Sequence, residues 1–495
     1  MNRLIYYSVI GLFFTPLFLT GQTATEAFRY SLFDPTGTAR NLGTGNSMFA
    51  IGPDFSAFAS NPSGLGGYRK SEFLFTAGLG INNFNSAFSE DQSNNTQSNF
   101  TNFTLPNIGF VIHTGSETGI WNSSNWAIGL NRVADYNREF RFEGNTPGSI
   151  ADSWRENAEG IDPDDLNGFE EGLAYSSGAI YDFENDNIYE TDFDQNSQYP
   201  FFKKESAILT GGKTELTLAY GAEIDHKMMF GFSIGLPIVN YNQIRRYRES
   251  DEAEDAIPFF NELEYTNSLN STGFGLNAKV GLTVKPTEFL NIALAFHSPT
   301  RLYMTDNFNT TLSYDFTDEN NDGPIESESP YGSFQYALRT PWSVSGGLGI
   351  IAGKSGFLAA HAKFTDYKSM KYKYDVRGNG DEYEQIEREV NDDIKTIYGS
   401  SLQLNMGGEL VLNTKYRVRG GITLQQSAFN NDNSFDPAFH AGIGYRAEYF
   451  YVDLGYKLSK DDEGYLPYET IDANQPLVVV DETKHQLAVT AGFKF

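Results

Sequence analysis

The last ten residues of the chain, 486–495 (QLAVTAGFKF), carry the pattern that decides the fold. Every second residue is apolar, namely Leu487, Val489, Ala491, Phe493 and Phe495. Because successive side chains of a β-strand point to opposite faces, this period of two predicts a strand with one apolar and one polar face. The same alternation recurs near 216–224, 274–284 and 416–424.

The faces opposite these apolar rows are rich in glycine and polar residues, and the alternating segments are long. This favours a membrane barrel, with lipid outside and a polar lumen, over a soluble sandwich. Alternation and turn signals predict an all-β, fourteen-stranded antiparallel transmembrane β-barrel within residues 71–495. The expected strands cover residues 71–85, 105–115, 124–142, 213–225, 228–249, 259–285, 287–303, 334–352, 356–374, 395–412, 415–428, 437–447, 449–459 and 483–495.

The connections between these strands are expected to alternate between long and short. Tight turns such as 225–227 and 285–287 would face the periplasm, and long loops such as 86–104 and 375–394 would face outward. The chain also ends on an aromatic residue, Phe495, as do most outer-membrane barrels, whose last strand is read by the barrel assembly machinery. We therefore expect a protein in the outer membrane of a Gram-negative bacterium, in contact with its lipids.

Composition narrows the function further. The 495 residues carry a formal net charge of −28, which makes nucleic acid an unsuitable partner, and the absence of Cys excludes disulfides and thiolate chemistry. The first residues, Met1-Asn2-Arg3, precede an almost wholly apolar stretch, and small residues follow at Gly21. Residues 1–21 are expected to be a signal peptide, with a membrane anchor as the alternative.

Residues 22–70 precede the first strand and do not alternate. They contain a glycine-rich pattern, formed by Ala39-Arg40, Gly43, Gly45, Asp54, Ser56 and Asn61-Pro62-Ser63-Gly64-Leu65. This pattern resembles the FadL family of outer-membrane transport proteins, which includes the TodX-type hydrocarbon channels; Ser63 departs from the usual Ala. The resemblance implies that this segment is a hatch plugging the lumen, and that long-chain fatty acids or other hydrophobic compounds pass by diffusion.

The family often has a kinked third strand that opens a lateral gap in the wall. Here Trp126, Ile128 and Leu130 share one parity, which would place Arg132 on the lipid face at a cost of about 2–4 kcal/mol. A bulge near Asn131 and Arg132 would turn the arginine away from lipid. This is the candidate lateral opening; an ordinary bulge or a later strand start is the alternative.

Lumen-facing parity selects Lys279 and Lys363 as candidate ligand-binding residues, because a fatty-acid carboxylate would pair with a cation in a dry site. The alternative is a set of lumenal ion pairs that hold the hatch. None of the six His lies in a spaced metal motif, and the sequence has no Gly-x-Ser-x-Gly elbow. We therefore do not expect an enzyme.

The expected loop from 143 to 212 is strongly acidic, with fifteen Asp or Glu against three Lys or Arg between 150 and 205. Leu166, Phe169 and Leu173 recur there at helical spacing after Asp162-Pro163-Asp164. The expectation is one amphipathic helix that gathers apolar ligand, or alternatively packs as a lid over the barrel mouth.

A second loop resembles the first half of a calcium-binding loop. Asp318, Asn320 and Asp322 precede Gly323, but the twelfth position is Ser329 in place of Glu. We regard this as a candidate structural Ca²⁺ site, with a solvated acidic loop as the alternative, and we expect no other cofactor.

The expected function is passive uptake of a hydrophobic compound, such as a fatty acid. Two alternatives stay open. One is a FadL-like barrel that serves as a binding or shuttle partner in protein secretion, as PorV does in the type 9 system; the acidic loops would suit a protein partner. The other is a general porin, which the plug-like segment disfavours.

Overall fold

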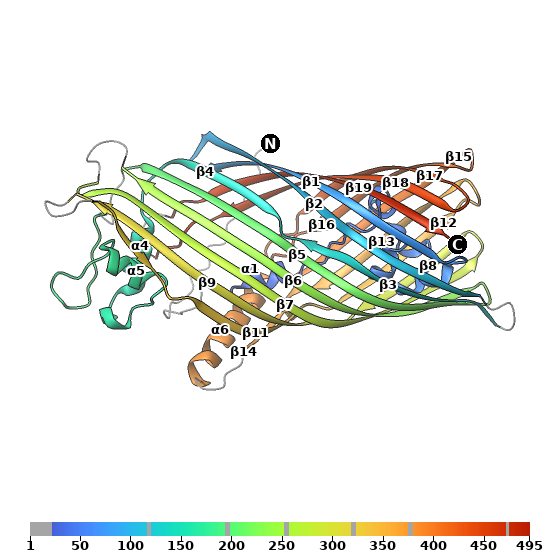
Figure 1. Ribbon diagram of the computed structural model, residues 1–495, viewed down its shortest axis with the longest axis horizontal. Coiled ribbons are helices and arrows are strands. Elements are labelled where there is room, and N and C mark those ends of the chain that lie inside the picture. The colour runs from blue at the N-terminus through green and yellow to red at the C-terminus, as the bar shows by residue number, and fades with distance from the viewer. Residues whose placement is uncertain are drawn as a thin grey trace.

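The computed structural model describes residues 22–115, 120–193, 199–251, 257–317, 323–374, 380–471 and 475–495. The expected signal peptide lies outside this range. In the described residues one long sheet curls into an elongated barrel (Figure 1). Its strands are β1 (Glu72–Phe88), β2 (Asp91–Gly115), β3 (Trp121–Asp135), β4 (Arg138–Thr146), β5 (Phe201–Ile224), β6 (Met228–Ser250), β7 (Phe260–Thr287), β8 (Leu290–His297), β9 (Arg301–Phe316), β10 (Ile325–Glu328), β11 (Gly332–Arg339), β12 (Ser343–Ile351), β13 (Gly356–Asp366), β14 (Lys371–Tyr374), β15 (Ser400–Leu412), β16 (Tyr416–Gln426), β17 (Phe435–Arg446), β18 (Phe450–Tyr465) and β19 (Val478–Lys494).

Several of these strands are consecutive pieces of one long strand of the barrel wall, which we call a stave. β3 and β4 both pair with β5, and β8 and β9 both pair with β7. β10, β11 and β12 likewise follow one another along β9 and β8, and β13 and β14 along β12 and β11. Counted in this way the wall has fourteen antiparallel staves, and β1 pairs with β19 to close it. The predicted fold is confirmed.

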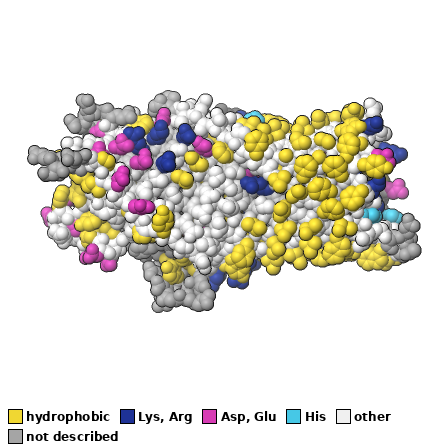
Figure 2. Space-filling model, in the orientation of Figure 1, with side chains coloured by type: hydrophobic (Ala, Val, Ile, Leu, Met, Phe, Trp, Pro, Cys, Tyr) yellow, Lys and Arg dark blue, Asp and Glu magenta, His cyan; other side chains and the backbone are white. Residues whose placement is uncertain are grey.

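The apolar rows face outward, as the alternation predicts. Figure 2 shows a continuous apolar band over the half of the barrel that carries the tight turns. Trp126, Ile128 and Leu130 are all exposed on it, and the residues between them are buried. An apolar exterior on a closed antiparallel barrel is the architecture of bacterial outer-membrane proteins.

The tight turns gather at one end of the barrel and the long connections at the other, with one exception. The loop expected at 86–104 is a tight connection, since β1 ends at Phe88 and β2 begins at Asp91. β5 similarly begins at Phe201 and not near 213. These strand ends lie beyond the apolar band, where the outward side chains need not be apolar. The first part of β2 is polar on both faces, and in β5 the apolar side chains Phe201, Ala207 and Leu209 are buried on the inward face, so neither stretch shows an outward apolar row.

Helices lie in the lumen, over the mouth and in one notch of the wall. The notch is the place where β14 pairs with β11 on one edge and with no described strand on the other. Inside the barrel lie α1 (Ala24–Ser31), α2 (Ala39–Gly43), η1 (Met48–Ala50), α3 (Ala57–Ser60) and η2 (Pro62–Gly67). Over the mouth lie α4 (Ile150–Ala158), η3 (Pro163–Asp165) and α5 (Glu171–Ser177), and η4 (Tyr367–Ser369) joins β13 to β14. Among the described residues, no helix is long and apolar enough to span a membrane.

The helix in the notch, α6 (Gly380–Ile397), replaces most of the loop expected at 375–394 and the first residues of the strand expected at 395–412. It lies beside β14, which pairs with β11 on one edge, and it supplies partners for the other edge. The Asn391 carboxamide accepts from the Tyr372 N–H (2.8 Å) and donates to the Tyr372 carbonyl (3.1 Å). Glu387 accepts from the Tyr374 N–H (2.9 Å). Helix side chains thus satisfy backbone groups that a neighbouring strand would otherwise pair.

Candidate functional site

The N-terminal segment, residues 22–70, contacts the inner face of the barrel on all sides. η2 packs against β3, β5, β6 and β7, η1 against β8, β12 and β13, and α2 against β16 to β19. Two glycines of the predicted motif allow this close approach. A Cβ atom at Gly43 would lie 2.9 Å from the Gly442 Cα, and one at Gly45, whose φ is +67°, would lie 2.9 Å from the Ile422 nitrogen.

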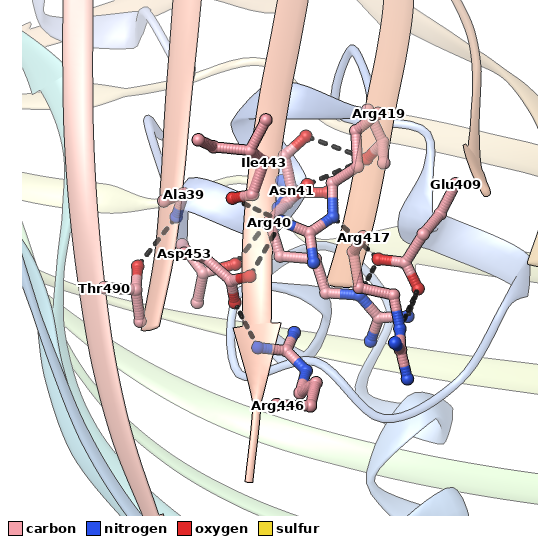
Figure 3. A network of polar contacts seen from close by, with 12 residues as sticks. Ala39, Arg40, Asn41, Glu409, Arg417, Arg419, Ile443, Arg446, Asp453 and Thr490 are labelled. Atoms are coloured by element: carbon pink, nitrogen blue, oxygen red, sulfur yellow. Dashed lines mark hydrogen bonds and ion pairs between the residues drawn. The ribbon is translucent and has the colours of Figure 1, made fainter. Parts of the chain in front are cut away.

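Arg40, also in the motif, joins the segment to the wall (Figure 3). Its Nε and Nη2 atoms both donate to the Glu409 carboxylate on β15, each at 3.0 Å. Glu409 also accepts from Arg419 at 2.6 Å, and Arg419 in turn contacts Asp453 at 2.7 Å. Asp453 accepts from Arg446 at 2.8 Å. The network therefore links α2 to β15, β16, β17 and β18 through alternating charges.

The other motif residues shape the segment itself. Asp54 accepts from the Thr38 hydroxyl at 2.9 Å and from the Ser56 N–H at 3.0 Å. Asn61 caps η2 by accepting from the Ser63 N–H (3.2 Å), and Pro62 takes the first helical position, which needs no donor. Their neighbours Gly64 and Leu65 are buried in the same turn.

Both lysines predicted to bind ligand line one small cavity of about 40 Å³ beside the N-terminal segment. Lys279 pairs with Glu215, and Lys363 donates to the Phe33 carbonyl at 3.2 Å. A third cation, Lys213, lines the same cavity and donates to the Tyr30 carbonyl at 2.8 Å. Parity did not single out Lys213, because the expected strand began at that residue.

The cavity is therefore rich in basic side chains. Its lining contains three lysines and no carboxylate, while Glu215 pairs with Lys279 from behind. Two of the ammonium groups lie over the Phe33 ring, Lys279 at 5.1 Å and Lys363 at 4.8 Å from its centroid. An anionic group entering this space would meet donors whose present partners on the segment are neutral carbonyls and an aromatic face.

The third stave breaks near the predicted kink. The register against β5 shifts between Arg132 and Ala134, and the stave is interrupted before β4 begins at Arg138. Arg132 bonds to Asp135 (3.2 Å) and to the Gly211 carbonyl, so it does not continue the lipid-facing row. In the described residues β2 pairs with β3 only as far as Asn107 opposite Asn131. Beyond this pair the described residues of β2 and β4 form no ladder, and they are joined by side-chain bonds such as that from the Ser98 hydroxyl to the Glu139 carbonyl (3.3 Å).

The single amphipathic helix expected across Leu166, Phe169 and Leu173 is wrong. The chain forms a 3-10 turn at Pro163–Asp165, leaves helical geometry at Leu166, and begins α5 only at Glu171. The turn at Asn167, whose carbonyl accepts from the Gly172 N–H (2.8 Å), interrupts the helix. Leu173 is nonetheless buried, and Phe169 packs against Phe308 of β9 at 4.9 Å. These side chains cover the mouth.

A helix that sequence analysis missed precedes this turn. Ser149 and Asp152 form a capping box at the start of α4, a signal that could have been read from their spacing. Trp154 buries the other face of α4 against Tyr265 of β7. Burial raises the pKa of the Asp152 carboxyl to about 7, and the Glu249 carboxylate contributes to the rise.

The candidate calcium residues Asp318, Asn320 and Asp322 lie outside the described residues. Within the described part of the chain no group of three or more His, Asp or Glu is placed to hold a metal ion. The calcium site stays a prediction.

No protein-family model matches the sequence, and a search of curated proteins finds no match. Solved structures do match the fold. A FadL homologue of Pseudomonas aeruginosa superposes with a TM-score of 0.56 at 13% identity, covering 94% of this chain and 100% of that one. The toluene transporter TodX of Pseudomonas putida superposes with a TM-score of 0.51 at 12% identity, with coverages of 94% and 100%. The chain therefore has the fold of the FadL- and TodX-type channels, as its N-terminal motif indicated.

Proposed function

We propose that this protein is an outer-membrane channel for the passive uptake of hydrophobic compounds. The observation that carries the proposal is a lumen occupied all round by the N-terminal segment, within a barrel whose outside is an apolar band. A general porin would keep an open aqueous lumen, which this segment occupies. The segment would act as a hatch that must shift before a ligand can pass.

We further propose that the ligand carries an acidic head group, as a long-chain fatty acid does. The three-lysine cavity supports this, because each ammonium group offers charge-assisted donors in a mostly buried setting. Entry of a carboxylate would compete with the Tyr30 and Phe33 carbonyls for Lys213 and Lys363. Ligand binding would thereby loosen the contacts that hold the hatch.

The route would begin at the loop end and finish at the break in the third stave. Large apolar side chains are exposed on the described loops, among them Phe183, Tyr199, Phe259 and Tyr331. Such residues could gather a scarce apolar ligand before it enters the mouth. The exit would lie beside Arg132, where the ladder between β2 and the third stave ends.

Mass spectrometry of small molecules retained by the gently purified protein tests the proposal. A bound long-chain fatty acid is the expected result. Lys279→Met and Lys363→Met should each weaken the binding of added dodecanoic acid by roughly tenfold or more, because each variant loses one charge-assisted hydrogen bond. Lys285→Met is the matched control, because Lys285 pairs with Glu223 close to a tight turn. A protein that retains no lipid and co-purifies with a stable protein partner would instead support a role in secretion.

A further inference from the structure

Two buried carboxamides face each other where the ladder between β2 and β3 ends. Asn107 and Asn131 form its last residue pair, and they are 0% and 2% exposed. Among the described residues, neither Nδ2 group has a hydrogen-bond partner. An unpaired buried donor costs about 1–3 kcal/mol. An oxygen atom from outside the chain would satisfy both donors.

Both side chains point into the lumen. The Asn107 Oδ1 atom accepts from the Thr76 hydroxyl at 2.8 Å, and Thr76 shares a hydrogen bond of 2.7 Å with Thr490. Thr490 accepts from the Ala39 N–H at 2.8 Å, and Ala39 belongs to α2 inside the barrel. Asn131 lies directly opposite Asn107 in an antiparallel ladder, so it shares that face.

The N-terminal segment bounds this position from two sides. On the tight-turn side, the Phe55 ring covers Gly109 and Gly129, the next residues of β2 and β3 on the lumenal face. On the loop side, the Asp34 N–H donates to the Val133 carbonyl at 2.9 Å, two residues beyond Asn131. The two unpaired donors thus lie between two contacts of the segment, with an aromatic ring beside them.

The neighbouring carboxylate does not serve these donors. Glu215 stands opposite Asn131 on β5, but its oxygens already accept from Lys279, from Thr217 (3.0 Å) and from Asn277 (2.8 Å). On the chain itself Asn131 is followed by Arg132, where the register shift begins. The pair therefore lies at the edge of the broken stave.

We infer that Asn107 and Asn131 form a binding site for an oxygen atom of the ligand's head group at the break between β3 and β4. The inference rests on the proposed uptake function and narrows the substrate class. Two N–H donors from facing strands can share one carboxylate or hydroxyl oxygen, whereas a hydrocarbon would leave both unpaired. A site built to hydrogen-bond an oxygen rejects the analogue that lacks it. The preferred cargo is thus an oxygen-bearing amphiphile and not a hydrocarbon.

The test compares two uncharged probes, dodecan-1-ol and dodecane, for binding to the purified full-length barrel by competition and mass spectrometry. Asn131→Leu should weaken the binding of dodecan-1-ol about fivefold, because one hydrogen bond is lost, and should leave the binding of dodecane unchanged. Asn107→Leu should act in the same direction. Neither probe is charged, so the lysine cavity adds no ionic attraction to either. Asn405→Leu is the matched control, since the Nδ2 group of this buried carboxamide on β15 already pairs with His361 Nε2 at 3.2 Å.

The outcomes separate the site from the function. If the wild-type barrel binds neither these probes nor dodecanoic acid, the proposed uptake function fails and the site fails with it. If it binds dodecanoic acid but not dodecan-1-ol, the uptake function stands and the oxygen site is overturned. If it binds both, and Asn131→Leu weakens both equally or neither, the uptake function stands and the oxygen site is overturned. Misfolding is a separate readout: replacing an unpaired buried donor by an apolar group should leave the melting temperature of Asn131→Leu unchanged or raise it.

Discussion

Removing the Arg40 side chain should release the N-terminal segment from the wall. Arg40 is the charged contact between α2 and β15, and its side chain is 20% exposed. Arg40→Met would delete two hydrogen bonds of 3.0 Å to Glu409 while keeping the length of the apolar stem. Glu409 would still accept from Arg419, so no carboxylate would be left unpaired.

The size of the effect follows from those two bonds. A hydrogen bond to a charged group contributes about 1.5–3 kcal/mol, and because Glu409 keeps one arginine we expect a loss of about 2–3 kcal/mol in docking free energy. At 1.4 kcal/mol per factor of ten, this raises the population of the undocked segment by about 30- to 150-fold. The undocked population of Arg40→Lys should lie between those of the wild type and Arg40→Met, because an ammonium group keeps the charge but cannot form the paired bonds.

Single-channel recording in planar lipid bilayers measures this population as the fraction of time spent in a conducting state. The control is Arg417→Met. Arg417 lies 3.8 Å from the same carboxylate but belongs to the wall strand β16, so its loss should leave the closed state intact. An Arg40→Met barrel as closed as the wild type, or an Arg417→Met barrel that conducts equally, would refute the reasoning.

Three further outcomes are expected. Deletion of residues 26–62 should convert the barrel into an unselective, permanently conducting pore in the same recordings, and a closed deletion variant would contradict the plug role. The raised pKa of Asp152 means that the docked segment over the mouth favours the protonated acid, so the contribution of this carboxyl to its stability is greatest below about pH 4 and falls as pH rises toward 7. Limited proteolysis within 147–193 should accordingly be faster at pH 8 than at pH 5. Asp152→Asn should reduce the difference without removing it, because burial also raises the pKa of the Glu170 carboxyl in the same segment to about 7. Asn391→Leu should cost about 1–3 kcal/mol and speed amide exchange at 371–374, whereas the exposed Gln385→Leu should leave that exchange unchanged.

The barrel could be predicted because its strands repeat one simple rule inside the apolar band. At Trp126, Ile128 and Leu130 each outward side chain must be apolar, so the sequence carries the alternation. The rule stops where the strands leave the band. The first half of β2 is polar on both faces, and the chain there resembles a loop.

Helices outside the repeat were harder to predict. In α6 the buried residues Ile386, Val390 and Ile394 recur every four positions, which is a helical signal inside a stretch whose polar composition favours a loop. The spacing of Leu166 and Leu173 predicts one helix where the structure has none that is continuous, because helical spacing in a short loop does not ensure a continuous helix.

The site was predicted only as far as local pattern reaches. Lys279 and Lys363 were found by parity, and the motif around Arg40 by resemblance. The partner of Arg40, however, is 369 positions away in sequence, and the unpaired state of Asn107 depends on how four strands and the inner segment meet. Such features arise from three-dimensional packing and leave no periodic trace.

The seam that closes the wall has a consequence for how the molecule forms. It joins strands from the two ends of the chain: Thr76 of β1 and Thr490 of β19 are 414 positions apart, so closing this loop carries the largest entropic cost of any ladder in the barrel. The inner segment comes before β1 in the chain and lies within the ring. Through α2 it contacts β19 on one flank of the seam, and through Phe55 it contacts β2 and β3 on the other. Its docking would hold the terminal strands near each other, so the residues that fill the finished lumen would also lower the cost of closing it.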